Sequence, residues 1–407
     1  MRCGLLGRKL AHSYSPQIHQ HLGDYDYILH EVEPAKLEDF LLHGDFSGLN
    51  VTMPYKKDVI PYCAELSEAA QRMGAVNTIL RRADGSLVGH NSDYYGFYSM
   101  IKKSGLHVAG RKVLVLGSGG ASGTVTAVLQ ELGAQAIVIS RTGANNYANL
   151  NLHRDAAVIV NTTPVGMYPN CGAAAVDIDQ FPALMGVLDL IYNPARTKLL
   201  MDAEKRGLIA ENGLWMLVAQ AKESAQWFTG QAIPDEKIRY IYEKLRMQME
   251  NIVLIGMPGC GKSTVGKLLA ESLGKTFVDV DHEICRAAEK SISGIFADSG
   301  EAAFRSVETS VLEELGKKSG QVIATGGGCV TREENFPLLH QNSRIIWLER
   351  DVQSLPVAGR PLSQAGSLMD MYRIRQPLYQ RFADYIVYNN DSPVDTVNKI
   401  LSQEDIR

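Results

Sequence analysis

The chain has 407 residues, more than one hydrophobic core usually supports, so we expect two or three domains and exclude a single small one. Its composition is 45% hydrophobic and 21% charged, which is typical of globular proteins and excludes a disordered or collagen-like chain. The 41 lysines and arginines stand against 45 acidic residues, so the net charge of -4 predicts neither a nucleic-acid nor a membrane partner.

Six cysteines are scattered along the chain without a C-x-x-C pair or a metal-ligand spacing. This usage favours a reducing compartment over a disulfide scaffold or a structural zinc site. The N-terminus resembles the start of a strand rather than a signal peptide, and no window holds the roughly 18 consecutive apolar residues of a membrane span. We therefore expect a cytoplasmic protein.

Short apolar runs alternate with segments of helical length along the whole chain, the pattern of parallel sheets covered by helices. In chain order, the predicted strands are 27–32, 48–51, 112–116, 136–140, 156–161, 186–189, 251–255, 276–280, 321–324 and 343–348. A polar stretch, 234–250, predicts a helix that leads into the last domain without a flexible linker. The predicted fold class is therefore α/β.

Two predicted strands run directly into glycine-rich loops, at 117–123 and 256–264. At a strand-to-helix turn, unpaired amide N–H groups and the positive end of the helix dipole favour an anion. Each loop therefore predicts its own nucleotide-binding domain.

The first loop has the context of a Rossmann unit, because it follows a buried-type strand, precedes a helix and is followed by a second strand. That second strand ends at Arg141. An acidic residue there would bind the ribose 2′-hydroxyl of NAD, whereas arginine suits a 2′-phosphate, which favours NADP. The alternative is a solvated surface arginine.

The second loop matches the full Walker A pattern, Gly-x-x-x-x-Gly-Lys-Ser, at residues 256–263. This pattern after a strand predicts a nucleoside triphosphate site in which Lys262 reaches the transferring phosphate and Ser263 binds magnesium. The predicted ATP contacts in this loop are Gly259, Cys260, Gly261, Lys262, Ser263 and Thr264.

Seven short motifs in order, within residues 1–245, resemble shikimate dehydrogenase. They are SYSP (13–16), NVTMPYK (50–56), GAVNT (74–78), GHNSD (89–93), NTTPVGM (161–167), DLIYNP (189–194) and GLWMLVAQ (213–220). The resemblance implies a substrate domain at 1–100 and 213–245 and a Rossmann NADP-binding domain at 101–212. It also implies reduction of 3-dehydroshikimate by NADPH, while Ser15 favours shikimate over the alternative substrate quinate.

Hydride delivery to a ketone leaves an alkoxide that must be protonated, and Lys56 is the predicted proton donor. Asp93 is assigned to orienting Lys56 and the substrate hydroxyl. The implied substrate contacts are Ser13, Ser15, Asn50, Thr52, Lys56, Asn77, Asn91, Asp93, Tyr192 and Gln220. The implied cofactor contacts are Gly117, Ser118, Gly119, Gly120, Ala121, Ser140, Arg141, Thr142, Asn161, Thr162 and Gly213.

Residues 250–407 resemble shikimate kinase through five motifs. They are FVDVD (277–281), GIF (294–296) with Gly300, Glu301, Phe304, Arg305 and Glu308 after it, GGG (326–328), GRPL (359–362) and RQPLY (375–379). The implied substrate contacts are Asp281, Arg305, Gly326, Gly327, Gly328 and Arg375. Arg360 is implied as a catalytic lid residue that closes onto ATP, and Asp279 is placed near the magnesium ion. Asp281 is a candidate acceptor for the proton of the substrate hydroxyl.

Together the two resemblances predict a bifunctional enzyme that makes shikimate with NADPH and then phosphorylates it with ATP and Mg²⁺. The expected partners are small molecules only, and we expect a monomer or a homodimer. The alternative is a sensor or scaffold in which one half binds ligand without turnover. The presence of Lys56, Asp93, Lys262, Asp281 and Arg305 argues against that alternative.

Overall fold

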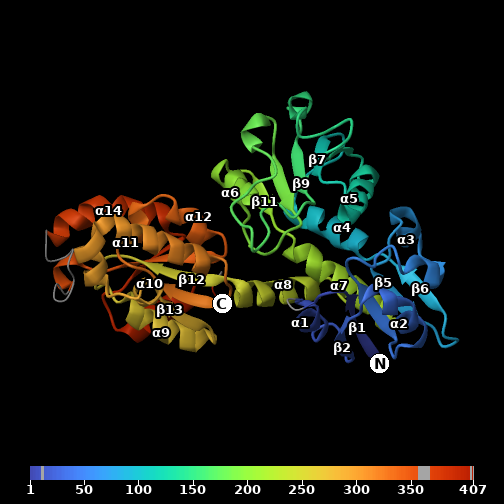
Figure 1. The fold of residues 1–407 in the computed structure, drawn as a ribbon, viewed down its shortest axis with the longest axis horizontal. Coiled ribbons are helices and arrows are strands. Elements are labelled where there is room, and N and C mark those ends of the chain that lie inside the picture. Colours follow the sequence, from blue (N-terminus) through green and yellow to red (C-terminus); the bar gives the residue numbers. More distant parts are fainter. Residues whose placement is uncertain (11–12, 356–366, 404–405, 407) are drawn as a thin grey trace. The chain divides into compact units, whose positions relative to one another are not determined.

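The computed structural model describes residues 1–10, 13–355, 367–403 and 406. Across these residues, it contains no helix with the length and apolar character needed to cross a bilayer. The chain forms two compact units (Figure 1). The N-terminal unit comprises Met1–Gly166, Ala173–Tyr192 and Leu199–Lys244, and the C-terminal unit comprises Met167–Gly172, Asn193–Lys198 and Leu245–Arg407.

The first sheet of the N-terminal unit has six strands in the order β2-β1-β3-β5-β6-β4. Their bounds are β1 (Arg2–Gly7), β2 (Asp26–Glu31), β3 (Gly48–Val51), β4 (Cys63–Leu66), β5 (Thr78–Arg81) and β6 (Leu87–His90). β5 runs antiparallel to both β3 and β6, so the prediction of parallel pairing alone is wrong for this sheet. Short connections from β5 to β6 allow this hairpin arrangement.

The helices of this part of the unit are α1 (Ser15–His19), α2 (Leu37–His43), α3 (Glu68–Met73), α7 (Leu214–Thr229) and the first part of α8 (Glu236–Met249). Leu6, Leu41, Leu49 and Ile79 are fully buried in one core beneath the sheet. α7 contacts β5 and packs along α4 (Asp93–Ser104), so a helix late in the sequence is brought to the end of strands that come early. The carboxyl end of β3 and the amino end of α4 lie at this junction, because Ser224 of α7 is hydrogen-bonded to Asn50 and Ser92.

The second sheet is wholly parallel, in the order β11-β10-β9-β7-β8. Its strands are β7 (Lys112–Leu116), β8 (Gln135–Ile139), β9 (Val158–Asn161), β10 (Gly186–Asp189) and β11 (Ile209–Glu211). Val113 and Val115 face α4 (Asp93–Ser104) and α5 (Gly120–Glu131), whereas Leu114 and Leu116 lie in the core that includes α6 (Lys198–Lys205). Because both faces of β7 are buried, its sequence is continuously apolar.

The C-terminal unit contains a parallel sheet in the order β13-β14-β12-β15-β16. Its strands are β12 (Asn251–Ile255), β13 (Thr276–Asp279), β14 (Gln321–Ala324), β15 (Ser343–Glu349) and β16 (Tyr385–Tyr388). Its helices are α9 (Lys262–Leu273), α10 (Val280–Ala288), α11 (Ile292–Gly316), α12 (Asn335–His340), α14 (Leu368–Phe382) and α15 (Pro393–Leu401). β12 is the central strand, so the loop that follows it opens at the middle of the sheet's carboxyl edge. The α/β prediction is confirmed in both units.

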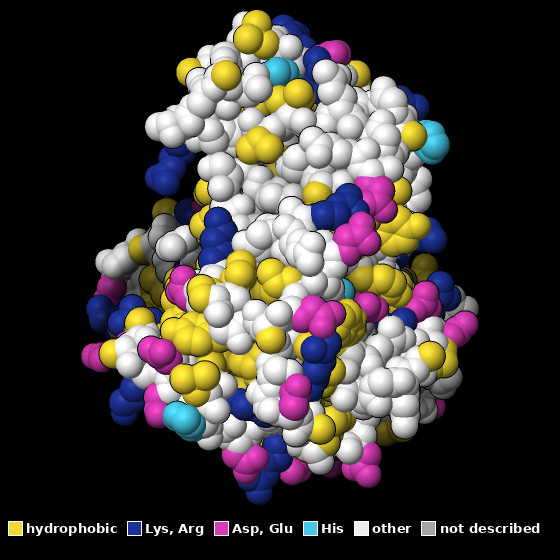
Figure 2. Space-filling view, turned by 90° about the vertical axis from the view of Figure 1, so that its right-hand side faces the viewer, with side chains coloured by type: hydrophobic (Ala, Val, Ile, Leu, Met, Phe, Trp, Pro, Cys, Tyr) yellow, Lys and Arg dark blue, Asp and Glu magenta, His cyan; other side chains and the backbone are white. Residues whose placement is uncertain are grey.

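Charged side chains of both signs are interspersed over the face of the molecule in Figure 2. This mixture agrees with the near-neutral net charge of -4.

Candidate active sites

Lys56 and Asp93, predicted from the sequence as a functional pair, form an ion pair in the N-terminal unit. Lys56 Nζ lies 2.6 Å from Asp93 Oδ2, and the two side chains are 30% and 16% exposed. Lys56 follows β3, and Asp93 is the first residue of α4. Partial shielding from water strengthens such a pair, so the carboxylate holds the ammonium in one direction.

The side-chain amide of Asn77 has a fixed orientation. Its Oδ1 accepts hydrogen bonds from the backbone N of Ser92 at 2.7 Å, from Ser92 Oγ at 3.2 Å and from Thr78 Oγ1 at 3.1 Å. Three donors on the oxygen make the NH₂ group point the other way. Asn77 is therefore arranged to donate rather than accept.

Asn50 is already engaged on both sides of its amide. Its Oδ1 accepts from Tyr27 Oη at 2.8 Å, and its Nδ2 donates to Ser224 Oγ at 2.7 Å. Ser224, on α7, is fully buried and its Oγ also lies 2.8 Å from Thr78 Oγ1 and 2.9 Å from Ser92 Oγ. We call Asn50, Asn77, Thr78, Ser92 and Ser224 the buried polar network. In it, Asn50 is bonded to the protein, and a substrate contact from Asn50 stays a prediction.

Two further predicted substrate residues border this network. Asn91 Nδ2 donates to Ala75 O at 3.0 Å, while its buried Oδ1 has no partner among the described residues and is free to accept. Gln220 Oε1 accepts from Ser92 Oγ at 3.3 Å. Gln220 is thus tied to the network through Ser92, whereas Asn91 is held by the backbone at Ala75.

The remaining predicted substrate residues lie at the ends of short elements. Ser13 Oγ accepts from the backbone N of Ser15 at 3.2 Å, and Thr52 N donates to Leu6 O at 2.9 Å. The Tyr192 ring meets the Tyr14 ring edge-on, with centroids 6.1 Å apart.

The first glycine-rich loop is shaped for close approach of a ligand. Gly117 has φ +102°, and a Cβ there would lie 2.9 Å from the Thr163 side chain. α5 begins at Gly120, and its N-cap Gly119 has no capping side chain, so the first amides of the helix are open to an anion. Ser118 lies in the loop, and Ala121 is the second residue of α5.

Predicted cofactor residues near this loop lie at the carboxyl ends of β8 and β9, the two strands that flank β7. Thr162 Oγ1 donates to Leu116 O at 2.7 Å, and Asn161 Nδ2 donates to Asp189 Oδ1 at 3.0 Å. After β8, Ser140 Oγ donates to Thr142 O at 3.0 Å, next to the exposed Arg141. Gly213 N donates to Ile191 O at 3.0 Å at the start of α7. The donor set fits a dinucleotide, because it offers open amides for a diphosphate and the exposed Arg141 guanidinium for a 2′-phosphate.

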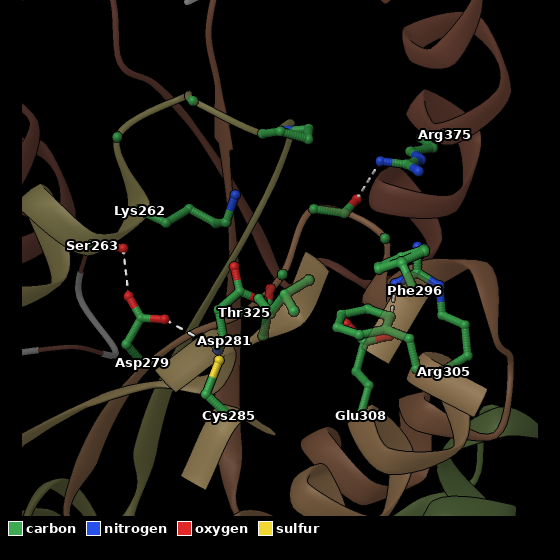
Figure 3. A pocket seen from close by; sticks show the side chains of 18 of the residues that line it. Lys262, Ser263, Asp279, Asp281, Cys285, Phe296, Arg305, Glu308, Thr325 and Arg375 are labelled. Atoms are coloured by element: carbon green, nitrogen blue, oxygen red, sulfur yellow. Dashed lines mark hydrogen bonds and ion pairs between the residues drawn. The ribbon is translucent and has the colours of Figure 1, made fainter. Parts of the chain in front are cut away.

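The second loop wraps the N-terminus of α9. Gly261 has φ +100°, and a Cβ there would lie 2.6 Å from Asn389 Nδ2, so only glycine fits. Lys262 Nζ donates to Gly256 O at 2.9 Å and Met257 O at 3.0 Å, which holds the ammonium over the loop. Ser263 Oγ donates to Asp279 Oδ2 at 2.7 Å (Figure 3).

A cavity of about 730 Å³ joins this loop to the predicted substrate residues. The predicted residues that line it are Gly259, Gly261, Lys262, Ser263, Thr264, Asp279, Asp281, Arg305, Gly326, Gly327, Gly328 and Arg375. The buried Cys260 side chain lies off this lining, and Arg360 lies outside the described residues. A nucleotide side and an arginine-rich side therefore share one cavity.

Arg305 is held by Glu308, a residue of the same motif to which the sequence assigned no role. Its Nη1 lies 2.8 Å from Glu308 Oε2, and its Nη2 lies 3.1 Å from Glu301 Oε1. The Glu308 side chain is 0% exposed and the Arg305 side chain 7%. Burial raises the pKa of Glu308, and the Arg305 charge opposes that rise. The spacing of three residues on one helix was the available signal for this pair.

On the opposite side of the glycines, Arg375 Nη1 donates to Gly327 O at 3.1 Å, and Tyr379 Oη donates to the same oxygen. Figure 3 shows Arg305 and Arg375 at one end of the cavity and Lys262 at the other. Two arginine forks at one end suit a carboxylate.

Asp281 lies between these two ends. Burial and the neighbouring Asp279 carboxylate raise its pKa, against the lowering effect of Lys262 and Arg305. A carboxyl group with a raised pKa exchanges protons closer to neutrality, as a general base requires. A Cβ on Gly326 would lie 3.0 Å from Asp281 Oδ1, so Gly326 leaves room beside this carboxylate.

Ser263 and Asp279 offer one hydroxyl and one carboxylate beside the phosphate loop. Within the described part of the chain, no cluster of three His, Cys, Asp or Glu side chains could hold a metal alone. Mg²⁺ usually keeps waters and takes one or two carboxylates together with substrate phosphates, so this donor set fits it.

Known families match both parts of the sequence. The model of the shikimate dehydrogenase substrate binding domain matches residues 5–79, and the shikimate kinase model matches residues 258–404. The shikimate dehydrogenase (NADP(+)) of Alkaliphilus oremlandii is 36% identical over 269 residues, which are 58% of this chain and 94% of that protein. That of Clostridium perfringens is 34% identical over 266 residues, 60% of this chain and 97% of that protein.

Solved structures resemble the same part of the chain. A chorismate mutase/shikimate 5-dehydrogenase fusion protein from Clostridium acetobutylicum is 35% identical with TM-score 0.57, covering 60% of this chain and 96% of its own. The shikimate 5-dehydrogenase of Thermus thermophilus, solved with NADP(H) and shikimate, is 30% identical with TM-score 0.55, covering 60% and 99%. The chain therefore belongs to the shikimate dehydrogenase family over its N-terminal part and carries a shikimate kinase domain after it, which makes it an oxidoreductase joined to a phosphotransferase of the shikimate pathway.

Proposed function

We propose that the N-terminal unit reduces 3-dehydroshikimate to shikimate with NADPH, and that the C-terminal unit phosphorylates shikimate to shikimate 3-phosphate with ATP and Mg²⁺. The observation that carries the proposal is the cavity of the C-terminal unit, where a phosphate loop and two carboxylate-binding arginines face one another. The Lys56–Asp93 pair gives the matching support in the N-terminal unit. Relatives named for NADP(+) support the choice of cofactor.

In the N-terminal unit, Lys56 holds the proton that the substrate oxygen takes up, and Asp93 directs the ammonium toward it. The Asn77 NH₂ group and the free Asn91 Oδ1 offer one donor and one acceptor to the substrate hydroxyls. Bound NADPH supplies the hydride. Arg141 binds its 2′-phosphate, with the open amides of α5 at the diphosphate.

In the C-terminal unit, Arg305 and Arg375 bind the substrate carboxylate and so place its hydroxyl beside Asp281. Asp281 accepts the hydroxyl proton, while Lys262 neutralises charge on the transferring phosphate. Ser263 and Asp279 hold Mg²⁺, which neutralises phosphate charge when bound. Lid closure by Arg360 stays a prediction.

We also propose three functional domains, at 1–100 with 213–245, at 101–212 and at 250–407. The three sheets support this division, because the first uses strands from Arg2–Gly7 to Leu87–His90, the second from Lys112–Leu116 to Ile209–Glu211, and the third starts at Asn251–Ile255.

Paired lysine substitutions in the full chain test the two activities separately. Lys56→Ala should lower the dehydrogenase kcat by about 10²- to 10⁴-fold, the usual effect of losing a general acid, and should leave the kinase intact. Lys262→Ala should abolish most of the kinase activity and spare the dehydrogenase. The matched controls are Lys57→Ala and Lys267→Ala, at exposed lysines near each site.

Retained shikimate phosphorylation by the Lys262→Ala variant would contradict the phosphate-loop assignment. Equal loss of both activities in either variant would contradict independent sites.

The substrate of the dehydrogenase is tested by comparing the oxidation of shikimate and of quinate by the unsubstituted chain. Quinate is the relevant competitor, because a quinate dehydrogenase from Corynebacterium glutamicum is 28% identical with TM-score 0.54. A higher kcat/KM for quinate would overturn the substrate proposal.

A further inference from the structure

Four cationic side chains line the cavity of the C-terminal unit, and three of them have partners. Lys262 donates to the carbonyls of its own loop, Arg305 pairs with Glu308, and Arg375 donates to Gly327 O. Arg350 also lines the cavity, and its buried Nε has no hydrogen-bond partner. Among the described residues, no hydrogen bond or ion pair involves its guanidinium.

The position of Arg350 follows from the register of the central strands. β15 runs parallel to β12 with Ile255 opposite Trp347, and a Cβ on Gly256 would lie 2.5 Å from Leu348 O. The chain then passes the carboxyl edge of the sheet at Arg350, beside the phosphate loop. Arg350 is thus at the nucleotide side of the cavity, apart from the substrate arginines.

A second link fixes this placement. The backbone N of Asn389 donates to Glu349 O at 2.8 Å, and Asn389 Nδ2 donates to Cys260 O within the phosphate loop. One buried asparagine therefore bridges the residue before Arg350 and the loop itself.

The acidic neighbours of Arg350 are occupied elsewhere. Glu349 Oε1 accepts from Tyr372 Oη at 2.7 Å, and Asp351 Oδ1 accepts from the backbone N of Gln353 at 3.0 Å. Arg350 is a partly buried cation that these carboxylates do not neutralise. Burying a charged donor without a partner is unfavourable, so such a group is suited to an anionic ligand.

We propose that Arg350 binds the phosphate chain of ATP during phosphoryl transfer. This inference rests on the proposed kinase function. Metal-bound ATP keeps a net negative charge, and Lys262 is the other cation on this side of the cavity. A planar guanidinium offers two parallel N–H donors to phosphate oxygens, which an ammonium cannot do.

The test uses the full chain with Arg350→Ala and Arg350→Lys, and with Arg373→Ala as the control at an exposed arginine of the same unit. The KM for ATP and for GTP is measured at saturating shikimate, and ADP binding is measured by calorimetry. Arg350→Ala should raise both nucleotide KM values, and weaken ADP binding, by about tenfold or more. Arg350→Lys should recover part of the loss, while Arg373→Ala should stay within about twofold.

Three results would overturn the inference. The first is an unchanged ADP affinity in Arg350→Ala, and the second is a rise in the KM for shikimate alone. The third is a rise in the KM for ATP without a rise in the KM for GTP, which would make Arg350 a contact of the base. Absence of kinase activity in the unsubstituted chain would instead contradict the proposed function, and ADP binding would still report on Arg350. Arg350→Lys retains the charge, so it keeps the test valid if Arg350→Ala does not fold.

Discussion

Ser224→Ala removes the hydroxyl at the centre of the buried polar network. Asn50 Nδ2 would lose its 2.7 Å acceptor and keep only distant contacts to Asn77 O at 3.4 Å and Thr78 Oγ1 at 3.5 Å. The Thr78 and Ser92 hydroxyls, at 2.8 and 2.9 Å from Ser224 Oγ, would each lose a partner as well. Each buried polar group left unpaired costs about 1–3 kcal/mol, so we expect a loss of about 2–4 kcal/mol after partial rearrangement.

For a folding unit of this size, such a loss lowers Tm by roughly 5–15 °C. The measurement is scanning calorimetry of the full chain, with Ser104→Ala as the matched control, because Ser104 is a buried serine of the same unit bonded only to backbone groups. Steady-state kinetics of shikimate oxidation should show a higher KM for shikimate, since Asn77 and Gln220 lose their alignment through Ser92.

The kinase KM values should not change in Ser224→Ala. The reasoning is refuted if Ser224→Ala lowers Tm no more than Ser104→Ala and leaves the KM for shikimate unaltered in the dehydrogenase reaction.

Three further changes test other contacts. Arg141→Ala should raise the KM for NADP by about tenfold and spare that for NAD, and an unchanged ratio would remove Arg141 from the 2′-phosphate site. Burial lowers the pKa of His19 from 6.5 to about 3, so the unfolded chain binds a proton that the folded one excludes. The free energy of unfolding of the N-terminal unit should therefore fall by about 1.4 kcal/mol for each pH unit from 6.5 down to 3. Urea titrations at several pH values measure this slope, and an equal slope in His19→Phe would disprove the contribution of His19. Glu308→Gln should raise the kinase KM for shikimate, because Arg305 loses its buried carboxylate; an unaltered KM would argue against that role.

The sequence predicted strands well where both faces are buried. The predicted strands at 112–116, 251–255 and 321–324 match β7, β12 and β14, since continuous apolar runs are required between two helix layers. It missed β4, β5, β6, β11 and β16, all of which except β6 are partly exposed and lack a long apolar run. In such strands, pairing depends on tertiary contacts more than on local propensity, so the antiparallel pairs of β5 could not be predicted.

The residues of the candidate sites also divide into those that a motif predicts and those that depend on tertiary contacts. Lys56 and Asp93 are 37 residues apart, and the motifs that contain them predicted their association. Ser224 was not selected, and Glu308 was part of a motif without an assigned role, because a buried partner is recognised only when the surrounding donors are known. Arg350 lies two residues after the strand predicted at 343–348, yet its place beside the phosphate loop depends on a strand order that the sequence does not specify.

The most direct test of the bifunctional assignment is a single reaction that contains the full chain, 3-dehydroshikimate, NADPH, ATP and Mg²⁺. NADPH absorbance and the phosphorylated product are followed together. We predict that NADPH is consumed and that shikimate 3-phosphate accumulates in the same reaction. Consumption of NADPH with shikimate as the only product, or no consumption at all, would contradict the account.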